Sequence, residues 1–116
     1  MGGDCGQLDR ALVRAAVQQH RDVTGHGPSR AQASHRDNVV VVLMWGALTQ
    51  GERSLAATGR VEAVRYMREQ LRDSMRAALV EAIEQVTGIG VNAFLGDTSV
   101  ERELTALLFV LERPIA

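Results

Sequence analysis

Hydrophobic residues recur at intervals of three and four along residues 7–24, and this spacing predicts an amphipathic helix. Gly25 follows at the position of a left-handed C-terminal cap, and Pro28 prevents the helix from continuing. Residues 30–35 form a weaker strand candidate. Seven apolar residues at 39–45, four of them consecutive valines, predict the strongest strand of the chain. Such an unbroken run indicates burial on both faces, or on one face with a partner over the other.

A capping box precedes the next predicted helix. The Thr49 hydroxyl is placed to accept from the Glu52 amide, while the Glu52 carboxylate reaches back to the Thr49 amide. A short helix is expected to run to about residue 58. Residues 60–87 then contain neither proline nor glycine, which predicts one helix of about 42 Å that ends before Gly88.

Two further apolar segments follow. Residues 91–96 alternate in the manner of a half-buried strand, and residues 97–103 are expected to form a loop. Residues 104–111 fit a helix or a strand, since leucine and alanine favour helices and Thr98 with Glu101 imitates a capping box. We favour a strand because the segment is short and follows a strand and a turn.

The predicted order of elements is α-β-β-α-α-β-β. Strand pairs between helices predict an α+β fold, a two-layer sandwich in which a long helix and an N-terminal helix cover a four-stranded sheet. A chain of 116 residues is long enough for one domain. We expect residues 7–113 to form it, after a disordered start at residues 1–6.

Composition narrows the possible functions. The chain is 46% hydrophobic and 23% charged with a net charge of −1, which argues against disorder and against DNA binding driven by bulk positive charge. Cys5 is the single cysteine, so no internal disulfide is possible. The longest apolar run, residues 39–48, is far shorter than the roughly 20 residues that span a bilayer. We expect a soluble cytoplasmic protein that does not itself span a membrane.

No group of residues has the spacing of a known catalytic or metal site. His20, His26 and His35 lie within sixteen residues, but no pair has the close spacing of zinc ligands and no cysteine joins them. The serines lack an elbow motif, and most carboxylates adjoin arginines. We therefore expect no metal, no cofactor and no enzymatic activity.

The turn at residues 25–28 is a candidate binding motif. Gly25 and Gly27 can expose backbone amides to a phosphate, with Arg30 close behind. A phosphate loop, however, leads from a strand into a helix, whereas here a helix precedes and Pro28 follows. A tight helix-to-strand turn explains Gly25, Gly27 and Pro28 equally well.

The long predicted helix carries parallel basic and acidic stripes at intervals of three and four, within pairing distance of each other. The basic stripe consists of Arg65, Arg68, Arg72 and Arg76, and the acidic stripe of Glu62, Glu69 and Asp73.

Charge is distributed against the dipole of this helix. Residues 60–76 hold five arginines and three acids, whereas residues 77–88 hold Glu81 and Glu84 and no base. Two copies packed antiparallel would bring unlike halves together, which predicts a homodimer whose interaction surface comprises the four arginines with Glu81 and Glu84. The proposed apolar centre of this contact is Met67, Leu71, Met75 and Leu79.

Short motifs follow one another over about residues 7–113. They are Gly25-His26-Gly27-Pro28, Val39-Val40-Val41-Val42-Leu43, Leu48-Thr49-Gln50-Gly51-Glu52, Gly59-Arg60, Val64-Arg65-Tyr66-Met67-Arg68, Met75-Arg76, Thr87-Gly88, Val91-x-Ala93-Phe94 and Phe109-Val110-Leu111-Glu112. In this order and at these separations they resemble the MpsC-like family, which is named after a Na+-translocating membrane potential-generating system. The Gln50-Gly51 step departs from the pattern but leaves the capping box intact.

The resemblance implies an accessory cytoplasmic component, associated with a larger membrane protein that translocates ions. Such systems are linked to membrane potential and inorganic-carbon supply, and no catalytic residues carry over to this chain. Two functional hypotheses follow. The first is a non-catalytic accessory or regulatory protein that acts by protein–protein interaction. The alternative is a small module that binds a phosphate-containing ligand, nucleotide or nucleic acid, through the arginine stripe of the long helix.

Overall fold

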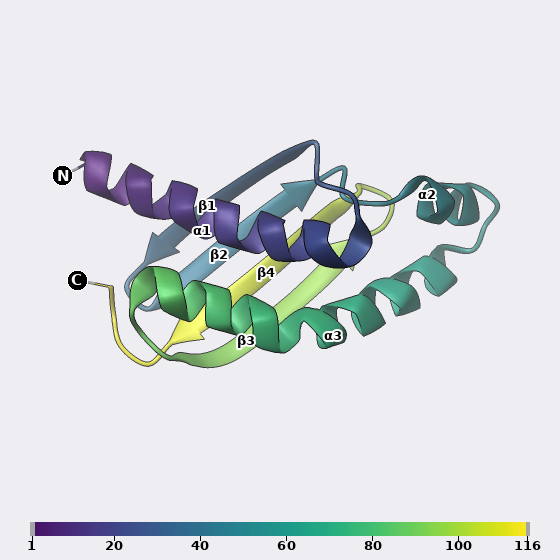
Figure 1. The fold of residues 1–116 in the computed structure, drawn as a ribbon. Helices are drawn as coiled ribbons and strands as arrows, with labels where there is room; N and C mark the ends of the chain where they lie inside the picture. Colours follow the sequence, from purple (N-terminus) through teal and green to yellow (C-terminus); the bar gives the residue numbers. More distant parts are fainter. Residues whose placement is uncertain (1, 116) are drawn as a thin grey trace.

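The structure, a computed structural model, describes residues 2–115, with side chains from residue 6 onward. Its elements are α1 (Gly2–Thr24), β1 (Arg30–Arg36), β2 (Val39–Trp45), α2 (Gln50–Ala57), α3 (Val61–Thr87), β3 (Val91–Ser99) and β4 (Leu104–Leu111). The four strands form one antiparallel sheet in the order β1-β2-β4-β3 (Figure 1). The predicted α+β sandwich and its order of elements are confirmed.

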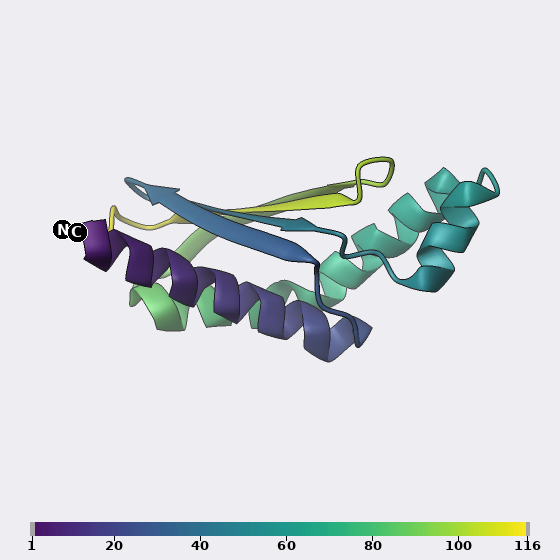
Figure 2. The ribbon, with the colours of Figure 1, turned by 90° about the horizontal axis from the view of Figure 1, so that it is seen from above.

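Both long helices pack on the same face of the sheet. Figure 2 shows α1 and α3 side by side beneath the strands, with α2 beyond one end of the sheet. Seen this way the molecule has two layers, one of strands and one of helices. The sheet therefore has one covered face and one open face within the described residues.

The core lies between the two layers. On β2, Val40, Val42 and Met44 are at most 1% exposed, because alternate residues of a strand point to the same face. Phe109 of the neighbouring β4 packs against Phe94 of β3, with ring centroids 4.9 Å apart. These side chains join those that α1 and α3 direct inward, among them Leu12, Ala16, Met75, Leu79 and Ile83.

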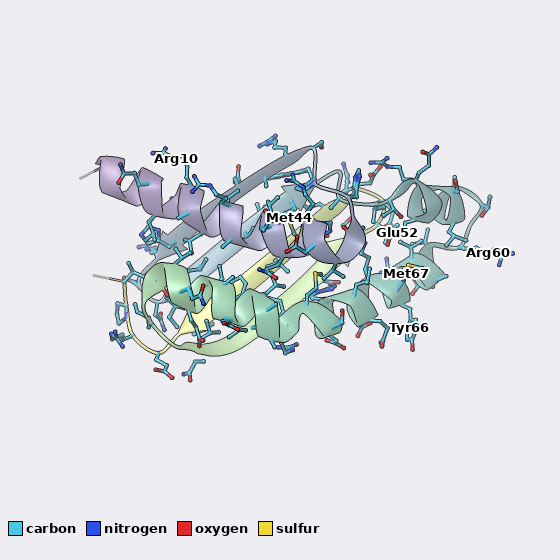
Figure 3. All side chains as sticks on the ribbon, in the orientation of Figure 1. Arg10, Met44, Glu52, Arg60, Tyr66 and Met67 are labelled. Carbon is cyan, nitrogen blue, oxygen red and sulfur yellow. The ribbon has the colours of Figure 1, made fainter. Side chains whose placement is uncertain are left out.

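A smaller apolar cluster lies beyond the sheet. It contains Leu48, Val64 and Val100, and residues of α2 pack against it. The long helix α3 connects the two clusters because it is 27 residues long and continues past the strands. Figure 3 places Tyr66 and Met67, which are 65% and 40% exposed, on this part of the helix.

The structure corrects two boundaries. α1 begins at Gly2, so residues 2–6, which we expected to be disordered, are helical; this stretch contains no proline, and each added residue gains a helix hydrogen bond. β3 continues to Ser99, although a loop was predicted from residue 97, because its last residues pair with the start of β4. The open choice at residues 104–111 is settled as a strand, β4, which has a strand on each side.

Candidate functional site

The predicted arginine stripe does not form one surface. Arg68 and Arg72 are only 4% and 8% exposed, whereas the side chains of Arg65 and Arg76 are partly exposed to solvent. The inward face of α3 follows the same three-and-four spacing as the stripe, and Arg68 and Arg72 fall on it. The prediction that all four arginines share an accessible contact surface is therefore wrong for these two.

The outer charges of α3 are held within the chain. Arg65 pairs with Glu62 and lies 3.7 Å from a carboxylate oxygen of Glu101. Arg76 lies 3.8 Å from Asp73. Two of the four pairs that the spacing predicts, Glu62–Arg65 and Asp73–Arg76, are therefore confirmed, whereas within the described residues Glu69 forms no ion pair with Arg65 or Arg72.

The other residues of the predicted interaction surface contact different parts of the chain and do not form one surface. Arg76 also donates to the Phe94 carbonyl at 3.1 Å, with its guanidinium 4.9 Å from the Phe94 ring. Glu84 accepts from the Val91 amide at 2.8 Å and so joins α3 to β3, while Glu81 is exposed. Met75 and Leu79, the proposed apolar centre of a helix–helix dimer, belong to the core of this chain.

The glycine turn is tied to its own helix. The Gly25 amide, at a φ of 71°, donates to the Arg21 carbonyl at 2.8 Å, which confirms the left-handed cap. A Cβ on Gly27 would lie 2.6 Å from a guanidinium nitrogen of Arg21. This guanidinium is the end of an exposed, flexible side chain that can move, so the contact does not require glycine at position 27; Pro28 leads into β1.

The most buried polar contact joins α2 to α3. Arg68 binds Glu52 with two parallel hydrogen bonds, Nε to Oε2 at 2.8 Å and Nη2 to Oε1 at 2.6 Å, and Glu52 is 3% exposed. Glu52 is also the capping-box residue: its Oε1 accepts from the Thr49 amide at 2.8 Å, as predicted. Nη2 of Arg68 donates further to the Ala47 carbonyl at 2.6 Å. Burial alone would raise the pKa of Glu52, but the hydrogen bonds from Arg68 and Thr49 outweigh it and lower that pKa.

His20 of α1 completes this network. Its Nε2 lies 2.9 Å from Nη1 of Arg68, and its Nδ1 lies 3.0 Å from the His26 carbonyl. Because arginine can only donate, Nε2 accepts and the ring proton sits on Nδ1. Burial and the positive charge of Arg68 lower the pKa of His20, so the ring is neutral near pH 7. The network thus holds three helices together at one end of the sheet.

The three histidines have separate partners. His26 contacts the Gly46 carbonyl and His35 contacts Asp9 at 2.7 Å, while His20 faces Arg68. Among the described residues, no three His, Cys, Asp or Glu side chains are grouped as metal ligands.

The open face of the sheet is apolar along its two central strands. The two central strands direct eight apolar side chains to it, and all eight are partly exposed. They are Val39, Val41, Leu43 and Trp45 of β2 and Leu104, Ala106, Leu108 and Val110 of β4. On β3, Leu95 lies beside Leu108 and is 62% exposed. We call these nine residues the open-face patch.

Polar residues border the open-face patch on both edge strands. The exposed residues of β1 opposite the patch are Arg30, Gln32, Ser34 and Arg36. The guanidinium of Arg30 lies 4.3 Å from the centre of the Trp45 ring. On the other edge, Asp97 and Ser99 of β3 are exposed beside Ala106 and Leu104. One edge of the patch is therefore positively charged and the other negatively charged.

Sequence reasoning found the turn, the capping box and the apolar run of β2, but neither the buried network nor the open-face patch. The network joins residues 16 to 48 positions apart, and no local spacing reports such contacts. A signal for the patch was present, since the unbroken apolar run at 39–45 indicated a second covered face.

No described helix is both long enough and apolar enough to cross a membrane. The family model for the Na+-translocating membrane potential-generating system (MpsC) matches residues 4–113, nearly the whole chain. The chain belongs to this family. Membership in the MpsC family confirms the resemblance seen in the sequence motifs, and its description associates the chain with a membrane potential-generating system. Comparison with curated proteins and with solved structures gives no match.

Proposed function

We propose that this MpsC-family chain is a non-catalytic, cytoplasmic accessory component that acts by protein–protein interaction through the open-face patch. The family description supports a role within a membrane potential-generating system. The observation that carries the contact surface is the row of eight apolar side chains along β2 and β4. An antiparallel sheet with one face in water normally carries polar residues there, so this face has the composition of a surface that a partner covers.

The whole open face of the sheet, which comprises the open-face patch and its polar borders on β1 and β3, is large enough for a specific contact. Four strands about 4.8 Å apart, with seven residues at about 3.3 Å each, present a face of roughly 19 Å by 23 Å. Two such faces pressed together bury on the order of 900 Å², close to the roughly 1,000 Å² expected of a specific interface. A contact of this size is at the lower end for specific interfaces, which is typical of transient rather than permanent association.

The partner that we propose for this face is a second copy of the chain. A twofold axis parallel to the strands lays β1 of each copy over β3 of the other, because the order of strands is reversed across such an axis. The edge with Arg30 and Arg36 then faces the edge with Asp97, so the charges at the rim are complementary. The predicted homodimer is thereby retained, with its contact moved from α3 to the sheet.

The alternative function, binding of a phosphate-containing ligand, required four accessible arginines on α3. Two of them are buried, so no observation favours that alternative over the interaction role. A larger membrane-associated ion-translocating protein stays a proposed partner of the dimer, on the strength of the family description.

Light scattering at micromolar concentration tests the proposal. The wild type should be dimeric, and Leu43→Arg should make it monomeric because a charge at the centre of the patch opposes its burial. Glu81→Arg on the outer surface of α3 is the matched control and should leave the dimer intact. A monomeric wild type would contradict the proposal, and so would a dimer that Glu81→Arg dissociates and Leu43→Arg does not.

A further inference from the structure

A groove runs along one edge of the sheet, between β1 and α1. Its volume is about 570 Å³. Three consecutive residues of β1, Ala31, Gln32 and Ala33, line one side, so the groove follows the edge of the strand. The other side is a flank of α1 between Asp9 and Arg21, which extends over about 18 Å of helix. This is the length of about five or six residues of an extended chain.

β1 is an edge strand whose outer backbone groups are open to a partner. A two-residue turn, residues 37–38, joins it to β2, so residues 30, 32, 34 and 36 direct their backbone N–H and C=O groups toward β2. Those of Ala31, Ala33 and His35 therefore point outward, and no strand of the described chain pairs with them. The pairing with β2 has no bulge, and β1 contains no proline. A regular edge of this kind can accept a further strand.

The helix side of the groove is positively charged. Arg10, Arg14 and Arg21 line it and are exposed, and none of them forms an ion pair with a carboxylate of the described side chains. The one acidic residue among the lining residues, Asp9, is already bound to His35 at 2.7 Å. The groove therefore attracts negative charge.

Apolar surface lies between these arginines and the strand. Val13 and Val17 fall on the helix between its core-facing residues and the arginines, and both are partly exposed. Along α1, Arg10 and Arg14 are about 6 Å apart, close to the roughly 6.6 Å between alternate residues of a strand. Side chains on one face of an added strand would thus meet successive arginines.

We propose that this groove binds an acidic, extended segment of a partner protein, which joins the four-stranded sheet as a fifth strand beside β1. The outward backbone groups of β1 hold the main chain of the segment, and its acidic side chains at alternate positions face Arg10, Arg14 and Arg21. Glutamate suits these positions because its methylene groups can cover Val13 and Val17 while its carboxylate reaches a guanidinium.

A second copy of the chain does not fit this edge. Two β1 strands paired antiparallel about Ala33 would place Arg30 of each copy opposite Arg36 of the other, and like charges directly opposite are destabilising. The groove also lies on the helix side of β1, away from the open-face patch. The inference goes beyond the proposed function and holds whether or not the chain dimerises.

Fluorescence anisotropy with a labelled peptide tests the proposal. The peptide has the length of β1, seven residues, and alternates glutamate with threonine. We expect saturable binding that Arg10→Gln combined with Arg14→Gln weakens roughly tenfold. Arg60→Gln is the matched control and should bind as the wild type does, because Arg60 is also exposed but lies at the opposite end of the molecule from Arg10 (Figure 3).

A second peptide separates strand addition from simple charge attraction. It has the same composition, but its glutamates are grouped at one end, so it should bind several-fold more weakly. No binding of the alternating peptide, or equal affinity for the two peptides, would overturn the proposal.

Hydrogen exchange of the wild type locates the bound segment. The alternating peptide should protect the amides of Ala31, Ala33 and His35, whereas those of Gln32 and Ser34, which face β2, should not change. Ala33→Pro removes an outward N–H and no bond to β2, so it should keep the circular dichroism of the wild type and lose peptide binding. Absence of protection at the three outward amides would refute strand addition even if Ala33→Pro does not fold, and so would a folded Ala33→Pro with wild-type affinity.

Phosphatidylglycerol vesicles test the other anionic surface that a basic groove could contact. We expect the wild type and the Arg10→Gln, Arg14→Gln double variant to sediment with the vesicles to the same small extent. Vesicle binding that the double variant loses, together with no binding of the alternating peptide, would assign the groove to a membrane surface and overturn the proposal.

Discussion

The two faces of β2 are built from the same kinds of residue but have different surroundings. Val40 and Val42 point toward α1 and α3 and are fully buried, whereas Val39 and Val41 point to the open face and stay partly exposed. A single layer of helices covers only one face of a sheet, and this chain places both long helices on the same side. Hydrophobicity along a strand therefore shows how many faces are apolar, but not which face the chain covers by itself.

The largest loss of stability is expected from a substitution on the covered face of the sheet. Val42→Asp places a carboxylate among apolar neighbours with no donor to receive it, which should cost about 4 kcal/mol or more of the free energy of unfolding. Urea unfolding followed by circular dichroism measures this loss. A stable variant would show that the helix layer does not exclude water from β2.

A substitution in the buried Arg68–Glu52 pair should lower stability nearly as much. Arg68→Met leaves Glu52 buried without its partner and should cost about 3 kcal/mol. Arg53→Met is the matched control, because Arg53 pairs with Glu103 at 2.8 Å on the surface, where such pairs contribute about 0–1 kcal/mol. Equal losses in the two variants would mean that the Arg68 pair is not buried in solution.

Low pH should reduce the stability of the protein because His20 is buried in its neutral form. The folded state lowers the pKa of this ring from 6.5, so below pH 6.5 the unfolded chain takes up a proton that the folded chain refuses. Stability should consequently fall as the pH drops from 7 toward 5. Glu52, whose pKa is lowered from 4.5, adds a further loss below about that pH.

A His20→Gln variant isolates the histidine contribution to this acid effect. Glutamine can still accept from Arg68 but does not titrate, so the slope of stability between pH 7 and pH 5 should flatten. Urea unfolding at several pH values measures the slope. An unchanged slope would place the titrating group elsewhere.

The smallest effect on stability is expected on the open face. If the apolar run at 39–45 were buried on both faces within one chain, as the sequence allows, Val41→Asp would cost several kcal/mol of the free energy of unfolding. In the structure Val41 lies on the open-face patch, so at concentrations too low for the proposed dimer the loss should be only about 1 kcal/mol, mainly from the poor strand propensity of aspartate. Sedimentation of the same variant at micromolar concentration should show a monomer, and a loss near that of Val42→Asp would erase the difference between the faces.

The fold was predictable because its boundaries are marked locally. Gly25, Pro28, the Thr49–Glu52 capping box and Gly88 each start or stop an element by backbone chemistry that acts over a few residues. The side chains of the candidate sites were not predictable in this way. The spacing of Arg68 and Arg72 fits a solvent-exposed stripe as well as it fits the inward face of α3. Their burial depends on residues distant in sequence that contact them, namely Glu52, His20 and Gly96.

The separate cluster beyond the sheet has a consequence for motion. Leu48, Val64 and Val100 give α2 and the start of α3 a small core of their own, and Arg68 connects this end to the main body through Glu52 and Ala47. Units with few apolar contacts open more often than the whole domain unfolds, so amide hydrogens of α2 should exchange well before those of β2 and β4. Loss of the Arg68 hydrogen bonds to Glu52 and Ala47 should therefore speed amide exchange in α2 much more than in β2 and β4.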